Sequence, residues 1–361
     1  MRIRTLVPAL ACLAAAQLIT AAETGPAIKF DGFVDSIYSV SSNEHGGSNT
    51  GFSYDAKLGV AATISEKVSA QVDLNIYDNQ DDSEGDNNWW YSRQMYGTWK
   101  INSDVELKTG KFISDYGWTA AYSPGLYRIN SGPIVALYGV DQVGANVKTT
   151  QGDFTVALTV ANGFFQEGYG TGGQDNNASV RNADNEAYAW GLDVVYSLGD
   201  MGSVNLELIA DQDVGDDGVA GAESGGDGYQ MGLNTTLTPS KELTVAAELI
   251  LTSVNNKGGY DNSSATGAMI LANYELATAM PMSVTAQFTY LDQDTDAVID
   301  DDTVTTETAL ALLTNPAGTD KLGANLEINY TSTETTTVTN GSSRSDTEYA
   351  LGFSAELLYV F

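Results

Sequence analysis

The sequence predicts an all-β fold: a transmembrane, antiparallel, up-and-down β-barrel of about 16 strands. Three observations support this prediction. Alternating segments are nearly twice as long as typical soluble strands, connections alternate between short turns and longer loops, and the chain begins with a segment typical of a secretory signal peptide.

Apolar side chains recur at every second position over about ten residues in several parts of the chain. The pattern is clear at 54–62, 68–76, 204–210 and 322–330, and again over the last residues, 352–361. Strict alternation describes a strand with one apolar and one polar face. A tilted strand needs about 9–11 residues to cross a bilayer, so these segments have the length of membrane-spanning strands.

The connections between these segments are of two kinds that alternate. Short turns occur near 65–67, 102–104, 149–153, 199–202, 238–241, 278–281 and 315–320. Longer stretches rich in Asp, Asn, Gly and Ser fall between them, at 41–51, 79–88, 113–140, 164–186, 212–227, 253–264, 292–303 and 332–345. This alternation and an even strand number are typical of outer-membrane barrels. A soluble β-sandwich would need several domains and shorter strands, and a β-helix would show a short fixed repeat, which we do not find.

The first residues are expected to be removed. Arg2 and Arg4 precede an apolar run at 6–19 that is too short to span a membrane, and small residues follow at 20–22. We therefore expect a signal peptide at 1–22 and a barrel at 23–361. No apolar run of 18 or more residues follows, so no membrane helix is expected.

Composition excludes several classes of function. The only cysteine, Cys12, lies in the expected signal peptide, and the only histidine, His45, lies in a Gly- and Asn-rich stretch. Disulfides, thiolate or multi-histidine metal sites and histidine-activated nucleophiles are therefore not expected, and we predict no enzyme activity, no metal and no cofactor. The net charge of −31 opposes nucleic-acid binding.

The last strand ends on aromatic residues of the apolar parity, Tyr359 and Phe361. In a closed barrel this strand pairs with the first one, because lipid offers no hydrogen-bonding partner to an open edge. Aromatic rings are favoured at membrane interfaces. We therefore expect both termini at the periplasmic, short-turn end and the long loops outside the cell.

Particular motifs carry a family resemblance. The stretch 110–118, GKFISDYGW, ends a predicted strand and opens the longest loop, and it is followed by YSPG at 122–125 and by Gly139-Val140. Together with the first mature strand, FDGFVDSIY at 30–38, these motifs resemble the OmpL-like outer-membrane β-barrel porin family of Gram-negative bacteria. General bacterial porins with sixteen strands are the neighbouring possibility, with the same architecture.

The polar parity of each strand is expected to face the lumen, because charged side chains in lipid are costly. The predicted lumen-facing charges are Asp31, Asp35, Asp55, Lys57, Asp73, Glu106, Lys108, Glu207, Glu248 and Glu327. A barrel of sixteen strands is wide enough for an aqueous channel.

The third long loop, 113–140, is less polar than the other loops, so it should pack on something. Its position and composition resemble the porin constriction loop, which folds inward and narrows the pore. The candidate constriction residues are Lys111, Asp115 and Arg128. The alternative is a helical or strand-like plug that lies on the barrel rim.

These observations predict ion transport and passive diffusion of small hydrophilic solutes, with cations preferred over anions because acids outnumber bases. The expected partners are outer-membrane lipid, such solutes and cations, and further copies in a homotrimer. The alternative is a plugged structural or adhesive barrel without an open pore. The acidic loops leave nonspecific divalent-cation binding open.

Overall fold

The computed structural model describes residues 27–44, 47–77, 90–113, 116–119, 125–138, 142–164, 189–214, 226–255, 262–296, 300–316, 321–339 and 342–361. The expected signal peptide at 1–22 lies outside the described residues, as do His45 and Asp115.

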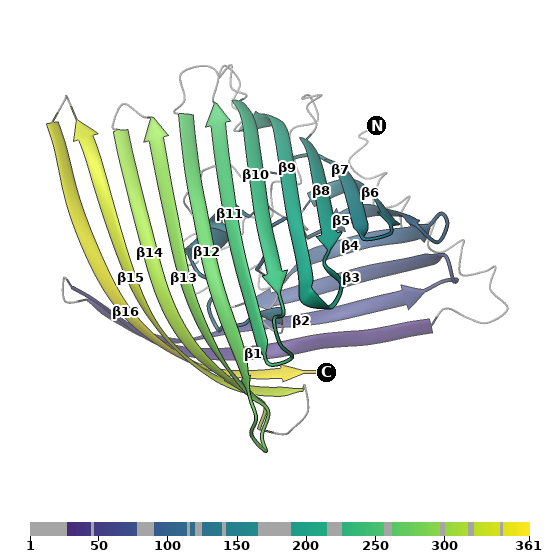
Figure 1. Cartoon of the computed structure of the whole chain (residues 1–361), viewed down its shortest axis with the longest axis horizontal. Coiled ribbons are helices and arrows are strands. Elements are labelled where there is room, and N and C mark those ends of the chain that lie inside the picture. Colours follow the sequence, from purple (N-terminus) through teal and green to yellow (C-terminus); the bar gives the residue numbers. More distant parts are fainter. Residues whose placement is uncertain are drawn as a thin grey trace.

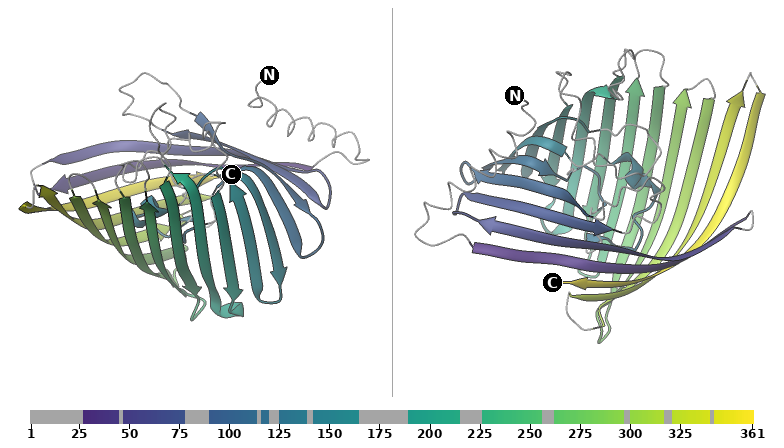
Figure 2. Two further views of the ribbon diagram at one scale, coloured as in Figure 1. Left: turned by 90° about the horizontal axis from the view of Figure 1, so that it is seen from above. Right: turned by 180° about the vertical axis from the view of Figure 1, so that it is seen from behind.

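Sixteen antiparallel strands within the described residues form one sheet that closes into a barrel (Figures 1 and 2). Each strand pairs with its neighbours in sequence, so the predicted up-and-down topology is confirmed. The strands are β1 (Ala27–Asn43), β2 (Ser48–Thr63), β3 (Val68–Tyr77), β4 (Trp90–Lys100), β5 (Val105–Phe112), β6 (Gln142–Gln151), β7 (Phe154–Ala161), β8 (Ala189–Ser197), β9 (Gly202–Val214), β10 (Gly226–Leu237), β11 (Leu243–Asn255), β12 (Asn262–Leu276), β13 (Met282–Asp296), β14 (Asp300–Thr314), β15 (Leu322–Thr339) and β16 (Ser342–Val360).

The barrel closes between its first and last strands. β1 and β16 pair in register from Phe33 with Val360 to Asn43 with Ala350. The terminal Phe361 continues the ladder, since its N–H donates to the Gly32 carbonyl at 3.0 Å and its own carbonyl accepts from the Gly32 N–H at 3.2 Å. Closure leaves no row of unpaired backbone groups for lipid to contact.

The strands run further into the long-loop end than the sequence predicts. The expected loops at 41–51, 292–303 and 332–345 are largely strand, and only residues 44–47, 297–299 and 340–341 separate the strands there. The boundary prediction was wrong because both parities are polar in these segments. Five of the residues at 332–345 are threonines, which favour strands. β15 and β16, at 18 and 19 residues, exceed the length that a bilayer requires.

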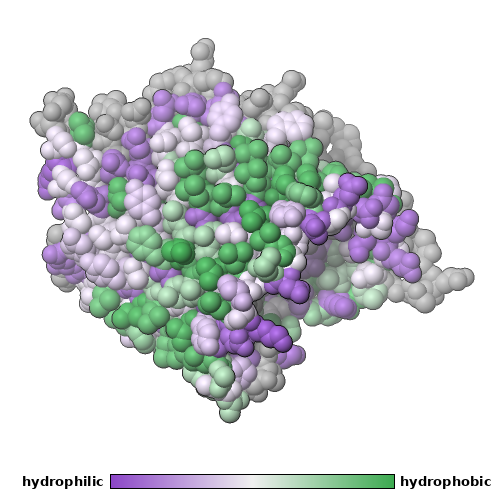
Figure 3. All heavy atoms as spheres, in the orientation of Figure 1, coloured by the Kyte–Doolittle hydropathy of each residue, from purple (hydrophilic) through white to green (hydrophobic). Residues whose placement is uncertain are grey.

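The two faces of the sheet differ as alternation predicts. On β13 and β14, Phe288 and Leu310 are 45% and 52% exposed, whereas Thr289 and Glu307 of the opposite parity are 0% and 6% exposed. Figure 3 shows apolar side chains gathered over the outer surface, with polar side chains toward its margins. The exposed apolar face is the outer face, and the buried polar parity is the inner face.

Within the part of the chain that the structure describes, two short 3₁₀ turns accompany the strands: η4 (Pro133–Leu137) in the β5–β6 loop and η6 (Gly199–Met201) between β8 and β9. Among the described residues, no helix is long and apolar enough to cross a membrane.

Candidate functional site: the β5–β6 loop and the inner wall

The β5–β6 loop, residues 113–141, connects two adjacent strands but contacts distant ones. Its described residues, 116–119 and 125–138, contact side chains of strands between β7 and β16. Tyr116 packs edge-on against Phe164 in a buried cluster. Three further sets of contacts hold the loop: one near its two ends, one at its middle, and an apolar one between them.

The first set of contacts, the proximal dock, joins both ends of the loop to Glu207 on β9 and Glu248 on β11. The Gly117 N–H donates to Glu207 Oε2 at 3.0 Å, and the Trp118 N–H donates to Glu248 Oε1 at 2.7 Å. The Tyr138 hydroxyl donates to the other Glu248 oxygen. One carboxylate thus receives donors from the beginning and the end of the loop.

Local backbone geometry favours this arrangement. Gly117 has a φ of 94°, which side-chain-bearing residues rarely adopt, and a Cβ there would lie 2.5 Å from the Tyr138 ring. Burial, followed by the charge of Glu248, raises the pKa of Tyr138 well above its ordinary value. Tyr138 therefore remains a hydrogen-bond donor at neutral pH.

The second set, the distal dock, places Arg128, Ile129 and Asn130 on Glu327 of β15. Arg128 donates from Nη2 to Glu327 Oε1 at 2.7 Å and from Nη1 to Glu307 Oε1 of β14 at 2.5 Å. Glu327 also accepts the Ile129 N–H at 2.8 Å, the Asn130 N–H at 3.1 Å and the Asn130 side-chain amide at 2.8 Å.

The charged side chains of this dock are buried. Arg128 is 3% exposed and Glu327 is 2% exposed. Burial alone would lower the pKa of Arg128, but its hydrogen bonds to Glu327 and Glu307 outweigh burial and raise that pKa above its ordinary value. Arg128 therefore stays charged and joins the loop to the wall.

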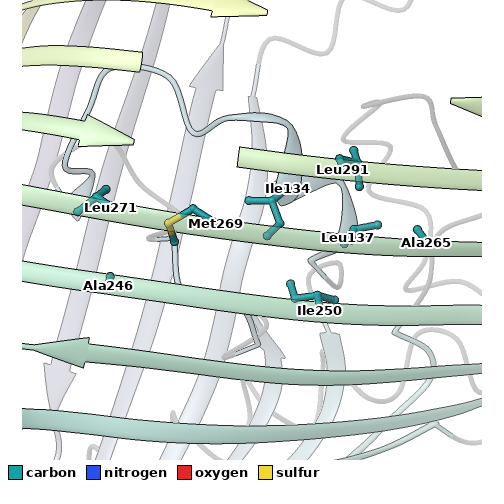
Figure 4. Close-up of a cluster of buried hydrophobic side chains, with 8 residues drawn as sticks. All are labelled: Ile134, Leu137, Ala246, Ile250, Ala265, Met269, Leu271 and Leu291. Carbon is teal, nitrogen blue, oxygen red and sulfur yellow. The ribbon is translucent and has the colours of Figure 1, made fainter. Parts of the chain in front are cut away.

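The third set is apolar and lies on β11, β12 and β13. Ile134 and Leu137 of η4 are 0% and 2% exposed and pack against the inner wall (Figure 4). The inner-face side chains of this cluster are Ala246, Ile250, Ala265, Met269, Leu271 and Leu291. This patch, together with the second buried cluster around Tyr116 and Phe164, matches the apolar composition of the loop.

The predicted constriction residues do not gather in one place. Arg128 lies in the distal dock, whereas Lys111 stays on β5, in register with Met95, and its Nζ donates to the Ser92 carbonyl at 2.8 Å. Asp115 lies outside the described residues.

The residues predicted as lumen charges fall into groups. On β1–β3, Lys57 Nζ lies 2.8 Å from Asp31 Oδ1 and 3.4 Å from Asp73 Oδ2. Asp35 pairs in register with Asp55.

On β5, Lys108 Nζ lies 5.5 Å from the Tyr96 ring centroid and 5.1 Å from that of Phe112. Glu106 pairs in register with both Lys100 and Lys148. Glu207, Glu248 and Glu327 bind the loop, as described above.

Sequence reasoning missed Glu307, Asn130 and Tyr138 as participants. Glu307 stands in a segment where threonine occupies both parities, so alternation did not single it out. The apolar composition of the loop was the signal that could have pointed to Tyr138 as a packing residue.

A closed sixteen-stranded barrel with an apolar outer face and a polar inner face is the architecture of bacterial outer-membrane porins. No protein-family model matches the sequence, and no curated protein matches it either.

Solved structures resemble the chain at low identity. The outer membrane channel DcaP of Acinetobacter baumannii has a TM-score of 0.66 at 11% identity, over 94% of this chain and 99% of that chain. An anion-selective porin from Comamonas acidovorans has a TM-score of 0.62 at 15% identity, over 93% and 100%. The trimer form of OmpT, an outer membrane protein of Vibrio cholerae, has a TM-score of 0.58 at 13% identity, over 94% and 100%. These likenesses establish a porin-type fold.

Proposed function

We propose that this protein is an outer-membrane porin through which small hydrophilic solutes and ions diffuse passively. The observation that carries the proposal is a closed sixteen-stranded barrel whose inner face is polar, since barrels of this strand number enclose aqueous channels. We assign it no catalytic role and no cofactor.

The β5–β6 loop would narrow this channel as a constriction loop. Its described residues contact the wall from β7 to β16, so the passage would run between the loop and the opposite wall, β1–β5. That wall carries Asp31, Lys57 and Asp73 as one ion-paired group, together with Lys108. Opposed charges across a narrow passage sort solutes by charge and dipole.

We propose that cations are preferred over anions. Acids outnumber bases in the whole chain and among the predicted lumen charges. The fold by itself does not determine whether cations or anions are preferred, because one structural neighbour is named an anion-selective porin. The reversal potential across a bilayer in a salt gradient tests the preference, and an anion-selective or zero potential contradicts it.

A second candidate is a plugged structural or adhesive barrel. The specific observation in its favour is that inner-face side chains such as Asp35, Glu207 and Thr289 are 0% exposed. Such burial is expected where side chains and loops fill part of the interior, so it supports this candidate.

Single-channel recording separates the two candidates. Protein covering residues 23–361 is reconstituted into a planar lipid bilayer, with heat-denatured protein as the control. Stepwise conductance supports the porin, and a silent bilayer with correctly folded protein supports the plugged barrel.

Location and assembly belong to the same proposal. We place the barrel in the outer membrane of a Gram-negative cell after removal of a signal peptide at 1–22, with the termini periplasmic and the long loops outside. A homotrimer is the proposed assembly, as the trimer form of the Vibrio protein illustrates for this fold. The OmpL-like porin family is the proposed relationship. Crosslinking in membranes tests the trimer.

A further inference from the structure

The two docks of the β5–β6 loop differ in how closely the flanking strands restrict the positions of their loop residues. Gly117, Trp118 and Tyr138 of the proximal dock lie about five residues from Phe112 or Gln142, so the strands already confine them. Arg128 lies about 15 residues from either strand, a contour reach of roughly 50 Å. Only noncovalent contacts therefore decide where the middle of the loop lies.

Those contacts converge on one carboxylate. Glu327 receives Arg128 through Nε at 3.3 Å and Nη2 at 2.7 Å, and it accepts both N–H groups of 129–130 and the Asn130 amide. Glu307 receives one bond from the loop, from Arg128 Nη1. Charge-assisted and bidentate hydrogen bonds of this kind are the strongest that side chains form.

We infer that Glu327 is the positioning residue that holds the middle of the loop against β15, and that its loss releases the loop from this wall. The part of the inference that concerns the pore rests on the proposed function. Arg128 faces two carboxylates of the wall, Glu327 and Glu307. Replacing Glu327 removes one negative charge from the wall and lets Arg128 move with the released loop toward the passage, so the variant should alter ion preference as well as aperture.

Release of the loop from β15 is measured first by chemical labelling, which does not depend on ion conduction. Ile129 is 4% exposed, and the only native cysteine, Cys12, is absent from a chain that begins at residue 23, so Ile129→Cys is a single labelling site. A membrane-impermeant maleimide is applied to the reconstituted protein. We expect Glu327→Gln to speed labelling at least about tenfold, because it breaks a buried ion pair.

Two matched substitutions serve as comparisons. Glu242→Gln removes the same charge from an exposed turn, where the carboxylate accepts the Ser240 hydroxyl at 2.9 Å, and should leave labelling unchanged. Glu248→Gln weakens the proximal dock and should speed labelling less than Glu327→Gln does. Labelling of Glu327→Gln at the parent rate, or equal acceleration by Glu248→Gln, overturns the inference. A β-sheet circular dichroism spectrum verifies folding.

The second readout is the ion current, which distinguishes a residue that positions the loop in the pore from one that only stabilises the fold. Glu327→Gln should raise conductance and reduce cation preference in a salt gradient. Adding Arg128→Gln should restore the preference while conductance stays high, because the displaced charge is gone but the loop is still released. Unchanged preference in Glu327→Gln contradicts the charge argument. If no form conducts, the proposed pore fails, whereas the labelling result still decides whether Glu327 holds the loop.

Discussion

A substitution at Gly267 can displace the β5–β6 loop while every hydrogen-bonding side chain of the loop and of its docks is kept. This residue lies on β12 between Ile250 and Leu291 of the neighbouring strands, beneath η4. A Cβ at this position would lie 2.8 Å from Leu137 Cδ1 and 2.9 Å from Ile134 Cγ1, closer than ordinary van der Waals contact. The perturbation is Gly267→Val, whose methyl groups extend further into the same space.

The magnitude follows from overpacking of a filled site. Inserting such a group into a packed apolar cluster costs about 1–3 kcal/mol, which would weaken docking of the loop by about 5- to 150-fold. Valine suits a strand better than glycine does, so the barrel itself should not become less stable. The strain therefore falls on the loop.

The assay combines maleimide labelling at Ile129→Cys with the midpoint of chemical unfolding. We expect faster labelling and an unchanged or higher midpoint. Gly51→Val is the matched control, because a Cβ at Gly51 meets nothing within 4 Å. The reasoning is refuted if Gly267→Val leaves labelling at the parent rate, or if Gly51→Val accelerates it equally.

Two further predictions concern single side chains. Lys57→Gln should lower the free energy of unfolding by about 1–3 kcal/mol, because the Asp73 side chain is 1% exposed and loses its ion pair with Lys57. Asp31→Asn should lower the free energy of unfolding by less, since the Asp31 side chain is 49% exposed. Equal unfolding midpoints for the two variants would contradict this. Tyr138 should remain protonated at about pH 10, where an ordinary tyrosine is half ionised, because its pKa is raised; its contribution to docking is present below that pH and is lost only as pH rises further. Ultraviolet difference titration against Tyr138→Phe measures this, and a Tyr138 signal with an ordinary midpoint would show that the phenol is not held as described.

The strand pattern shows where local reasoning succeeds. Alternation predicted the strands of the barrel and its two faces, because side chains on successive residues point to opposite sides of a strand wherever that strand lies. It failed at 332–345, where polar residues on both parities belong to β15 and β16 and not to a loop. Beyond the apolar outer belt, water replaces lipid and the alternation signal disappears.

The site required more than alternation. Arg128 was singled out from the sequence, but its partners Glu307 and Glu327 lie 179 and 199 residues further along the chain. From the sequence alone, any of several inner-face carboxylates could have been the ion-pair partner of Arg128. The apolar composition of the loop predicted that it packs on something, without saying on which strands.

The sequence by itself determined the number of strands, their up-and-down order and the two faces of the sheet, since these follow from residue type and period-two geometry. Only the tertiary structure decided that Glu207, Glu248 and Glu327 bind the β5–β6 loop, and that Gly267 makes room for η4. The path of a loop about 30 residues long depends on contacts between segments remote in sequence, and loop length alone leaves the middle of such a loop a wide choice of positions.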